Sequence, residues 1–196
     1  MADCYAHSKN VLCEMGSQRM SDAAEAVRLF FALWPSSDLQ AKLALWAKQV
    51  AGRGRPMRRE NLHLTLAFLG ATDAALVPDL LALAAGVRFD PIRLPLDRAG
   101  YWKHNRIIWC GAGEEPQALS SLVAGLRARL DAARIRYDPK PFVSHVTLVR
   151  DATGLPPDLV WPALVWEARD FALVSSTRVA GRVIYQVMQL FPARTN

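Results

Sequence analysis

The chain has 196 residues, 52% of them hydrophobic, and a formal net charge of +6. A chain of this length and composition can bury one sizeable core, which predicts a single domain. Its apolar stretches all fall short of the roughly eighteen residues that a membrane helix requires, and its start lacks the pattern of a signal peptide. We therefore expect a soluble, cytoplasmic protein without a membrane partner.

The charge distribution and the cysteines narrow the class of protein further. Residues 1–25 hold two basic and four acidic groups, so residues 26–196 carry a formal charge of about +8. This excess favours a polyanionic partner, and an ordinary basic surface is the alternative. Cys4, Cys13 and Cys110 are an odd number and lack zinc-site spacing, which indicates a reducing compartment rather than a disulfide framework.

Regular patterns begin only after an irregular start. Residues 1–25 mix small, polar and charged types without a sustained period, so we expect a flexible N-terminal extension there. Residues 26–196 form the predicted domain. Within it, residues 27–33 are typical of a strand, and Ser36 or Ser37 can cap a helix that continues to Gly52.

The middle of the chain alternates between strand and helix patterns. Residues 62–69 form an apolar strand that Gly70 ends, and Asp73 can cap a helix that runs through Gly86. Residues 92–96 and 106–110 are further strand candidates. The segment 97–105 between them is expected to be an irregular connection.

The second half repeats this order of elements. A helix from residue 119 to about 134 carries a strong apolar stripe, strand 142–149 follows it, and strands 168–175 and 182–191 end the chain. A helix followed by a strand with the sequence His-x-Thr occurs twice, which indicates an internal duplication. We predict an α+β fold: a bilobal single domain with two pseudo-symmetric antiparallel-sheet-plus-helix lobes around a central cleft.

Two tetrapeptides of one chemical type carry the functional prediction. They are His63-Leu64-Thr65-Leu66 and His145-Val146-Thr147-Leu148, 82 residues apart. Residues i and i+2 of a strand share a face, so each segment directs a histidine and a threonine hydroxyl the same way. One isolated histidine on a strand is usually structural. The same pair twice favours a site where one imidazole acts as base, the other as acid, and the hydroxyls bind oxygens of a phosphodiester.

Strict alternation gives a definite prediction for the neighbours of the first motif. His63, Thr65 and Ala67 should share the polar face, while Phe68 should point with the leucines into the core.

The sequence around both motifs is similar to a known family. HLTL and HVTL resemble the His-x-Thr signatures of the two-histidine phosphoesterases, and RLFFALW, ENLHLTLAFLG and PFVSHVTLVR resemble stretches of the RNA 2′,3′-cyclic phosphodiesterases, or 2′-5′ RNA ligase family, over about residues 27–192. The resemblance implies a bilobal α+β fold with a central cleft. It also implies hydrolysis of a 2′,3′-cyclic phosphate end to a 2′-phosphate, with His63 as proton donor and His145 as proton acceptor.

Further residues are candidates for binding the substrate. The HVTxxR run of the family implies that Arg150 holds phosphate charge. Alternation would turn Arg150 away from His145, so this assignment requires the strand to end, twist or bulge at Val149. The aromatic residues Phe68, Tyr101 and Trp102 can stack on a terminal base, and core packing is the alternative for Phe68.

Several other functions stay open from the sequence. A metal site is disfavoured because threonine is a poor zinc ligand and no third ligand has the right spacing, so we expect no metal and no cofactor. The expected partners are RNA ends or small cyclic nucleotides, bound by a monomer that has no obligate protein partner. The alternatives are reversible 2′-5′ ligation of RNA, cleavage of another cyclic or 2′-5′-linked nucleotide, and a non-catalytic module that binds RNA ends.

Overall fold

The computed structural model describes residues 26–157, 161 and 164–194. The flexible extension predicted for residues 1–25 lies outside the described residues. The strands are β1 (Ala26–Leu33), β2 (Arg55–Pro56), β3 (Leu64–Asp73), β4 (Ile92–Leu96), β5 (Arg98–Trp102), β6 (Ile107–Gly111), β7 (Val146–Arg150), β8 (Leu164–Ala168), β9 (Asp170–Val179) and β10 (Arg182–Pro192). The helices are α1 (Ser37–Val50), α2 (Val77–Ala85) and α3 (Gln117–Ala132), with 3-10 turns η1 (Arg59–Asn61) and η2 (Ala74–Leu76).

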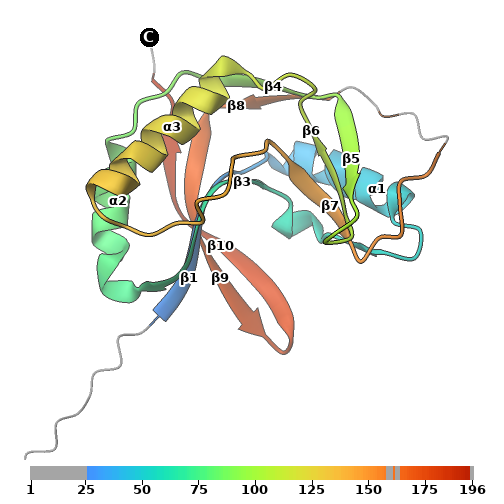
Figure 1. Cartoon of the computed structure of the whole chain (residues 1–196), viewed down its shortest axis with the longest axis horizontal. Helices are drawn as coiled ribbons and strands as arrows, with labels where there is room; N and C mark the ends of the chain where they lie inside the picture. Colours follow the sequence, from blue (N-terminus) through green and yellow to red (C-terminus); the bar gives the residue numbers. More distant parts are fainter. Residues whose placement is uncertain (1–25, 158–160, 162–163, 195–196) are drawn as a thin grey trace, which may run out of the picture.

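One antiparallel sheet runs through the molecule in the order β10-β9-β1-β3-β7-β6-β5, and β2 adds to β7. Figure 1 shows two arms of this sheet, one formed by β10, β9, β1 and β3 and the other by β7, β6 and β5. The arms are joined where Leu64 of β3 pairs with Val146 of β7. The predicted α+β class with antiparallel strands is therefore confirmed, and the two halves share one continuous sheet.

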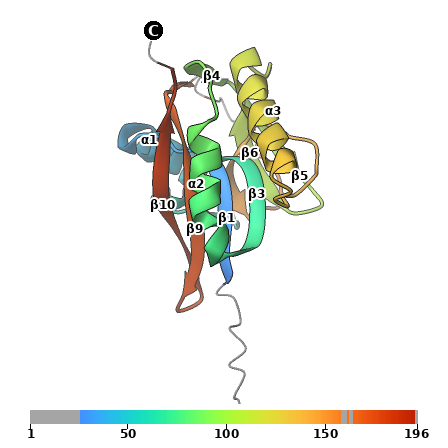
Figure 2. The same ribbon diagram turned by 90° about the vertical axis from the view of Figure 1, so that its left-hand side faces the viewer.

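Helices α1 and α3 each pack against the arm of the sheet that does not contain the preceding strand. The side chain of Ser36 accepts a hydrogen bond from the Leu39 amide at 3.3 Å, which caps α1 as predicted. α1 precedes β3 in the chain but packs against β7, and α3 precedes β7 but packs against β3. Each helix thus covers the strand of the other His-x-Thr motif. Figure 2 shows α2 alongside β9, β10 and β1, and α2 also contacts α3.

Alternate residues of β1 fill two different cores. Leu29, Phe31 and Leu33 lie in the main core beneath the helices. Phe30 and Ala32 lie on the opposite face, in a small apolar cluster with residues of β9. β1 is therefore buried on both faces, which is why it reads as a continuous apolar run instead of an alternating one.

The amphipathic stripe predicted for the third helix agrees with the structure. The leucines and the valine of this stripe are all buried: Leu119, Leu122, Val123, Leu126 and Leu130. Cys110 is a free, buried thiol, and burial raises its pKa to about 12. None of the described helices has the length and apolar character needed to cross a bilayer.

Several predicted element boundaries were wrong. The segment 97–105 contains strand β5, which pairs with β6. The strand predicted at 168–175 is in fact two strands. Ala168 ends β8, which pairs with β4 outside the main sheet, and β9 begins at Asp170. β3 continues past Gly70 to Asp73, whose side chain caps η2 instead of an α-helix. These boundaries depend on strand partners far away in the chain, which local patterns do not encode.

Candidate active site

The two His-x-Thr segments meet at the junction of the two arms. His63 and His145 directly precede the paired residues Leu64 and Val146. The predicted strands included both histidines, but β3 begins at Leu64 and β7 at Val146, so each histidine lies one residue before its strand. Continuing this antiparallel register by one residue sets His63 opposite Thr147 and His145 opposite Thr65. The motifs are thus related by a local pseudo-two-fold axis.

Both imidazoles are held in the same way by the backbone. Nδ1 of His63 lies 2.7 Å from the carbonyl oxygen of Asn61, and Nδ1 of His145 lies 2.7 Å from that of Val143. A carbonyl only accepts, so each Nδ1 carries the proton and donates it. Nε2 of each neutral ring then carries the lone pair that can accept a proton, and it can deliver a proton only after the ring has been protonated. Nε2 of His63 also lies 3.1 Å from the Thr65 hydroxyl, which donates to it.

Asn61 connects the first histidine to the distant strand β10. Its side chain is buried, and its Nδ2 donates to the carbonyl of Val183 at 3.1 Å. The same residue supplies the carbonyl that orients His63. The position of this imidazole therefore depends on packing between η1 and β10.

Aromatic rings surround His63. The Trp34 ring stacks on it with centroids 5.7 Å apart and an interplanar angle of 12°. Phe30 lies 4.8 Å away in a tilted arrangement, and Tyr185 meets the imidazole edge-on at 5.1 Å. His145 has one such neighbour among the described residues, Trp102, at 4.6 Å. These rings shield part of each half-buried imidazole from water and limit its rotation.

Burial among these rings shifts both histidine pKa values downward. Desolvation lowers the pKa of His63 to about 4, and the charges of His145 and Arg150 contribute in the same direction. The pKa of His145 is also lowered, mainly by desolvation and further by Arg150. Both rings are therefore neutral at pH 7 in the free protein. An anion bound between them would raise both pKa values and favour protonation of one ring.

A β-bulge follows the threonine of the first motif. Thr65 pairs with Ala32 of β1, but the next partner of Phe31 is Ala67, so Leu66 is the extra residue. Leu66 and Ala67 are both buried. The prediction that Ala67 shares the face of Thr65 was therefore wrong.

The same bulge places Phe68 on the polar face instead of in the core. Phe68 pairs with Phe30, whose side chain lies on the face opposite the main core. The residue Phe68 is 37% exposed. The guanidinium of Arg28 lies over the Phe68 ring, 5.4 Å from its centroid. Core packing of Phe68 was a wrong expectation, and the residue remains a candidate for contact with substrate.

The second motif carries an equivalent bulge. Thr147 pairs with Trp109, whereas Ile108 pairs with Val149, so Leu148 is the extra residue in β7. Leu148 and Val149 both point into the main core, and Arg150 returns to the face of Thr147. The strand therefore bulges near Val149, as the assignment of Arg150 to the phosphate required. Phe68 and Arg150 occupy equivalent positions, each three residues after a motif threonine.

The two aromatic candidates of β5 lie on different faces. Trp102 faces the site, where it contacts His145 and the ring of Trp109. Tyr101 instead packs against the main core, and its hydroxyl donates to the carbonyl of Ala152 at 3.0 Å. The structure does not bring Tyr101 to the site, because neighbouring residues of a strand point in opposite directions.

Other features of the described residues lie apart from this site. Within the described ranges no group of three His, Cys, Asp or Glu side chains is close enough to hold a metal ion. Two surface hollows, beside α1 and between α2 and β10, include none of the His-x-Thr residues.

Sequence reasoning missed the groups that surround and orient the histidines. Trp34, Tyr185 and Asn61 come from three separate segments, and the orienting carbonyls belong to the backbone. A backbone carbonyl has no sequence signature. The only available signal was that Asn61 and Val143 each lie two residues before a motif histidine.

The antiparallel α+β fold and the relatives of this chain place it among the phosphoesterases. A family model described as LigT like phosphoesterase matches residues 33–109. The RNA 2′,3′-cyclic phosphodiesterase of Escherichia coli (strain K12) is 34% identical over 168 residues, which cover 83% of this chain and 94% of that protein. The protein of the same name from Thermus thermophilus is 34% identical over 183 residues, which cover 86% of this chain and 91% of that protein.

Solved structures agree with these relatives. Escherichia coli LigT in complex with 3′-AMP superposes with a TM-score of 0.77 at 30% identity, covering 87% of this chain and 100% of that chain. The chain belongs to the LigT-like phosphoesterase family.

Proposed function

We propose that the protein hydrolyses 2′,3′-cyclic phosphate ends of RNA to 2′-phosphomonoesters without a metal ion. The observation that carries this proposal is the convergence of His63 and His145 at the Leu64–Val146 pair, each with Nδ1 held by a backbone carbonyl. The names of the relatives from Escherichia coli and Thermus thermophilus support the substrate class. The basic charge of residues 26–196 supports a polyanionic substrate.

The reaction requires one proton acceptor and one proton donor on opposite sides of phosphorus. His145 takes a proton from water at Nε2 as the water oxygen bonds to phosphorus. The bond from phosphorus to the ribose 3′ oxygen breaks, and His63 delivers a proton from Nε2 to that oxygen. The family resemblance supports this direction of the two roles. Such general acid and base catalysis contributes roughly 10²- to 10⁴-fold per group.

The low pKa of His63 is compatible with its role as acid. A ring with a pKa of about 4 gives up its proton readily, but it is rarely protonated in the free protein at pH 7. The anionic cyclic phosphate raises this pKa when it binds, so the substrate itself promotes the protonated form. Displacement of water by the bound anion strengthens the same effect.

Three further groups bind the oxygens that do not react. The hydroxyls of Thr65 and Thr147 and the guanidinium of Arg150 lie on the same face as the imidazoles. Hydrogen bonds from these groups to the non-bridging oxygens stabilise the charge that builds up at phosphorus. One preorganised donor of this kind is worth about 3 kcal/mol of barrier.

Phe68 and Trp102 provide aromatic surfaces for the terminal base. Each flanks one motif on the site face, and Phe68 is exposed enough to stack. The solved complexes of Escherichia coli LigT with 3′-AMP and with phosphate support a nucleotide phosphate as ligand. We further propose that the protein acts as a monomer, and the free thiol of Cys110 is compatible with a reducing compartment such as the cytoplasm.

Incubation with a defined oligonucleotide that ends in a 2′,3′-cyclic phosphate tests the proposal. We expect a 2′-phosphate product at equal rates with and without EDTA, because the reacting groups are side chains. A 3′-phosphate product, or loss of activity with EDTA, would contradict the proposed chemistry. Joined RNA halves would indicate 2′-5′ ligation, and binding without any product would indicate an RNA-end binding module.

A further inference from the structure

An acidic residue directly follows the arginine assigned to the phosphate. Asp151 lies at the end of β7, next to Arg150. Carboxylate and phosphate both offer paired oxygens to the fork of a guanidinium. A free Asp151 carboxylate would therefore compete with the substrate for Arg150.

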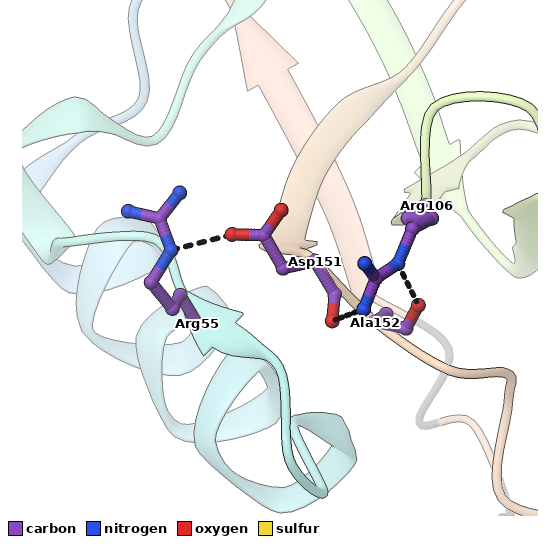
Figure 3. A network of polar contacts seen from close by, with 4 residues as sticks. All are labelled: Arg55, Arg106, Asp151 and Ala152. Carbon is purple, nitrogen blue, oxygen red and sulfur yellow. Dashed lines mark hydrogen bonds and ion pairs between the residues drawn. The ribbon is translucent and has the colours of Figure 1, made fainter.

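Figure 3 shows the carboxylate of Asp151 directed toward Arg55. Nε of Arg55 donates to its Oδ2 at 2.6 Å. Asp151 itself has a φ of +55°, a left-handed conformation that non-glycine residues seldom adopt. This turn directs its side chain toward β2.

Hydrogen bonds from Arg106 and Tyr101 hold the backbone at Asp151 and Ala152. Arg106 donates from Nη2 to the Asp151 carbonyl at 3.0 Å and from Nε to the Ala152 carbonyl at 3.4 Å. The Ala152 amide donates to the carbonyl of Arg106 at 2.9 Å, and the Tyr101 hydroxyl also donates to Ala152. These contacts fix the unusual conformation of Asp151.

The pairing of β2 with β7 brings Arg55 within reach. Arg55 pairs with Arg150 and Pro56 with Val149. Gly54 permits this approach, since a Cβ at that position would lie 2.6 Å from Cγ1 of Val149. Two arginines directly opposite each other repel, so the pair is unfavourable unless an anion lies nearby.

Near Arg150, several arginines therefore share one carboxylate. Asp151 forms an ion pair with Arg55, while Arg150 has no acidic partner within 4.0 Å among the described residues. Nearby Arg55, Arg106 and Arg150 all favour the ionised carboxylate and lower the pKa of Asp151, with the hydrogen bond from Arg55 as the largest cause. Arg106 donates to backbone carbonyls, so Arg150 is the one of these three arginines that is left for an external anion.

We propose that Arg55 is a positioning residue that holds the Asp151 carboxylate away from Arg150 and so keeps Arg150 available for the substrate phosphate. This inference rests on the proposed function, in which Arg150 contacts that phosphate. Arg55 itself does not touch the reacting atoms. It acts through Asp151, and removing both residues should do less harm than removing Arg55 alone.

The test compares the variants Arg55→Met, Asp151→Asn and the double variant. We measure steady-state kinetics on a 2′,3′-cyclic nucleotide, and the binding of inorganic phosphate by calorimetry. Arg55→Met should raise KM and weaken phosphate binding by about tenfold, with a smaller change in kcat. The double variant should return both values to within about threefold of the wild type, because the competing carboxylate is gone.

Arg53→Met is the matched control. It removes the same charge two residues earlier, in the turn before β2, and Arg53 forms no ion pair with any residue that the structure describes. An equal loss in Arg53→Met and Arg55→Met would indicate only long-range charge and overturn the inference. A loss that Asp151→Asn fails to rescue would indicate damage to β2 and overturn it as well.

Phosphate binding separates this inference from the proposed function. If the wild type binds phosphate but does not hydrolyse the cyclic nucleotide, the proposed reaction is wrong. The pattern of phosphate affinities among the variants then still supports or overturns the role of Arg55.

Discussion

Leu64 of β3 pairs with Val146 of β7, and this pairing joins the two arms of the sheet. Both side chains are fully buried in the main core. Because the flanking residues point to the opposite face, the pair fixes both histidines and both threonines at one place. A hydrophobic contact with no chemical role thus determines the geometry of the site.

The first prediction concerns the two histidines. His63→Ala and His145→Ala should each lower kcat by about 10²- to 10⁴-fold, because each removes a proton-transfer group. Circular dichroism should still show a folded protein. His104→Ala, in the exposed turn at residues 103–106, is the control and should keep its activity. Near-normal turnover in both single variants would refute the assigned roles.

The second prediction is a bell-shaped pH profile of kcat/KM with its maximum between about 4 and 6.5. The free protein must hold one protonated and one neutral histidine, and the pKa of His63 is about 4 while that of His145 is lowered from 6.5. The profile of kcat should lie at higher pH, since the bound anion raises both pKa values. Initial rates across the pH range give both curves, and a maximum of kcat/KM above pH 7 would contradict the burial of the rings.

Stability should also depend on the protonation of His63. In the unfolded chain its pKa is near 6.5, whereas in the folded protein it is about 4. The unfolded state therefore binds the proton first as the pH falls, and the free energy of unfolding should decrease between pH 6.5 and 4 by about 3 kcal/mol from this group.

Urea unfolding at several pH values measures this decrease. His63→Gln should flatten the pH dependence, and His104→Gln should leave it unchanged. The same slope in His63→Gln and in the wild type would show that another group is responsible.

Gly111 has a steric role beside His145. A Cβ at Gly111 would lie 2.4 Å from the carbonyl oxygen of Ser144 and 3.5 Å from Cα of His145. Gly111→Ala should displace the segment that carries this histidine, lowering kcat at least about tenfold and also lowering the melting temperature.

Gly125→Ala is the matched control for this substitution. Gly125 lies in α3 with open space around its Cα, and alanine there should stabilise the helix by up to about 1 kcal/mol without changing activity. Normal kcat in Gly111→Ala would mean that the backbone beside His145 adapts freely.

Phe68 should affect binding more than turnover. Phe68→Ala should raise KM for 2′,3′-cyclic nucleotides about tenfold by removing a stacking surface. A ribose 2′,3′-cyclic phosphate without a base should show no such change. Leu45→Ala, at a residue of α1 that is 60% exposed, is the control. Equal losses on both substrates would argue against stacking.

Much of the secondary structure was predictable because its signals are local. The cap at Ser36, the stripe of α3 and the apolar run of β1 each lie within one short segment. The repeated His-x-Thr tetrapeptide also predicted that two distant strands would lie side by side, and β3 pairs with β7. Strand β5 and the separate β4–β8 pair were not predictable in this way, because their stability comes from partners elsewhere in the chain.

The order of residue types was enough to propose the reacting groups and the segments that carry them. How those groups are presented depends on the folded chain. The bulges at Leu66 and Leu148 bring Phe68 and Arg150 to the site face, and the carbonyls of Asn61 and Val143 fix the imidazoles. The sequence specifies the side-chain type at each position directly. Strand register, bulges and desolvation instead arise from contacts between segments that come together only when the chain folds.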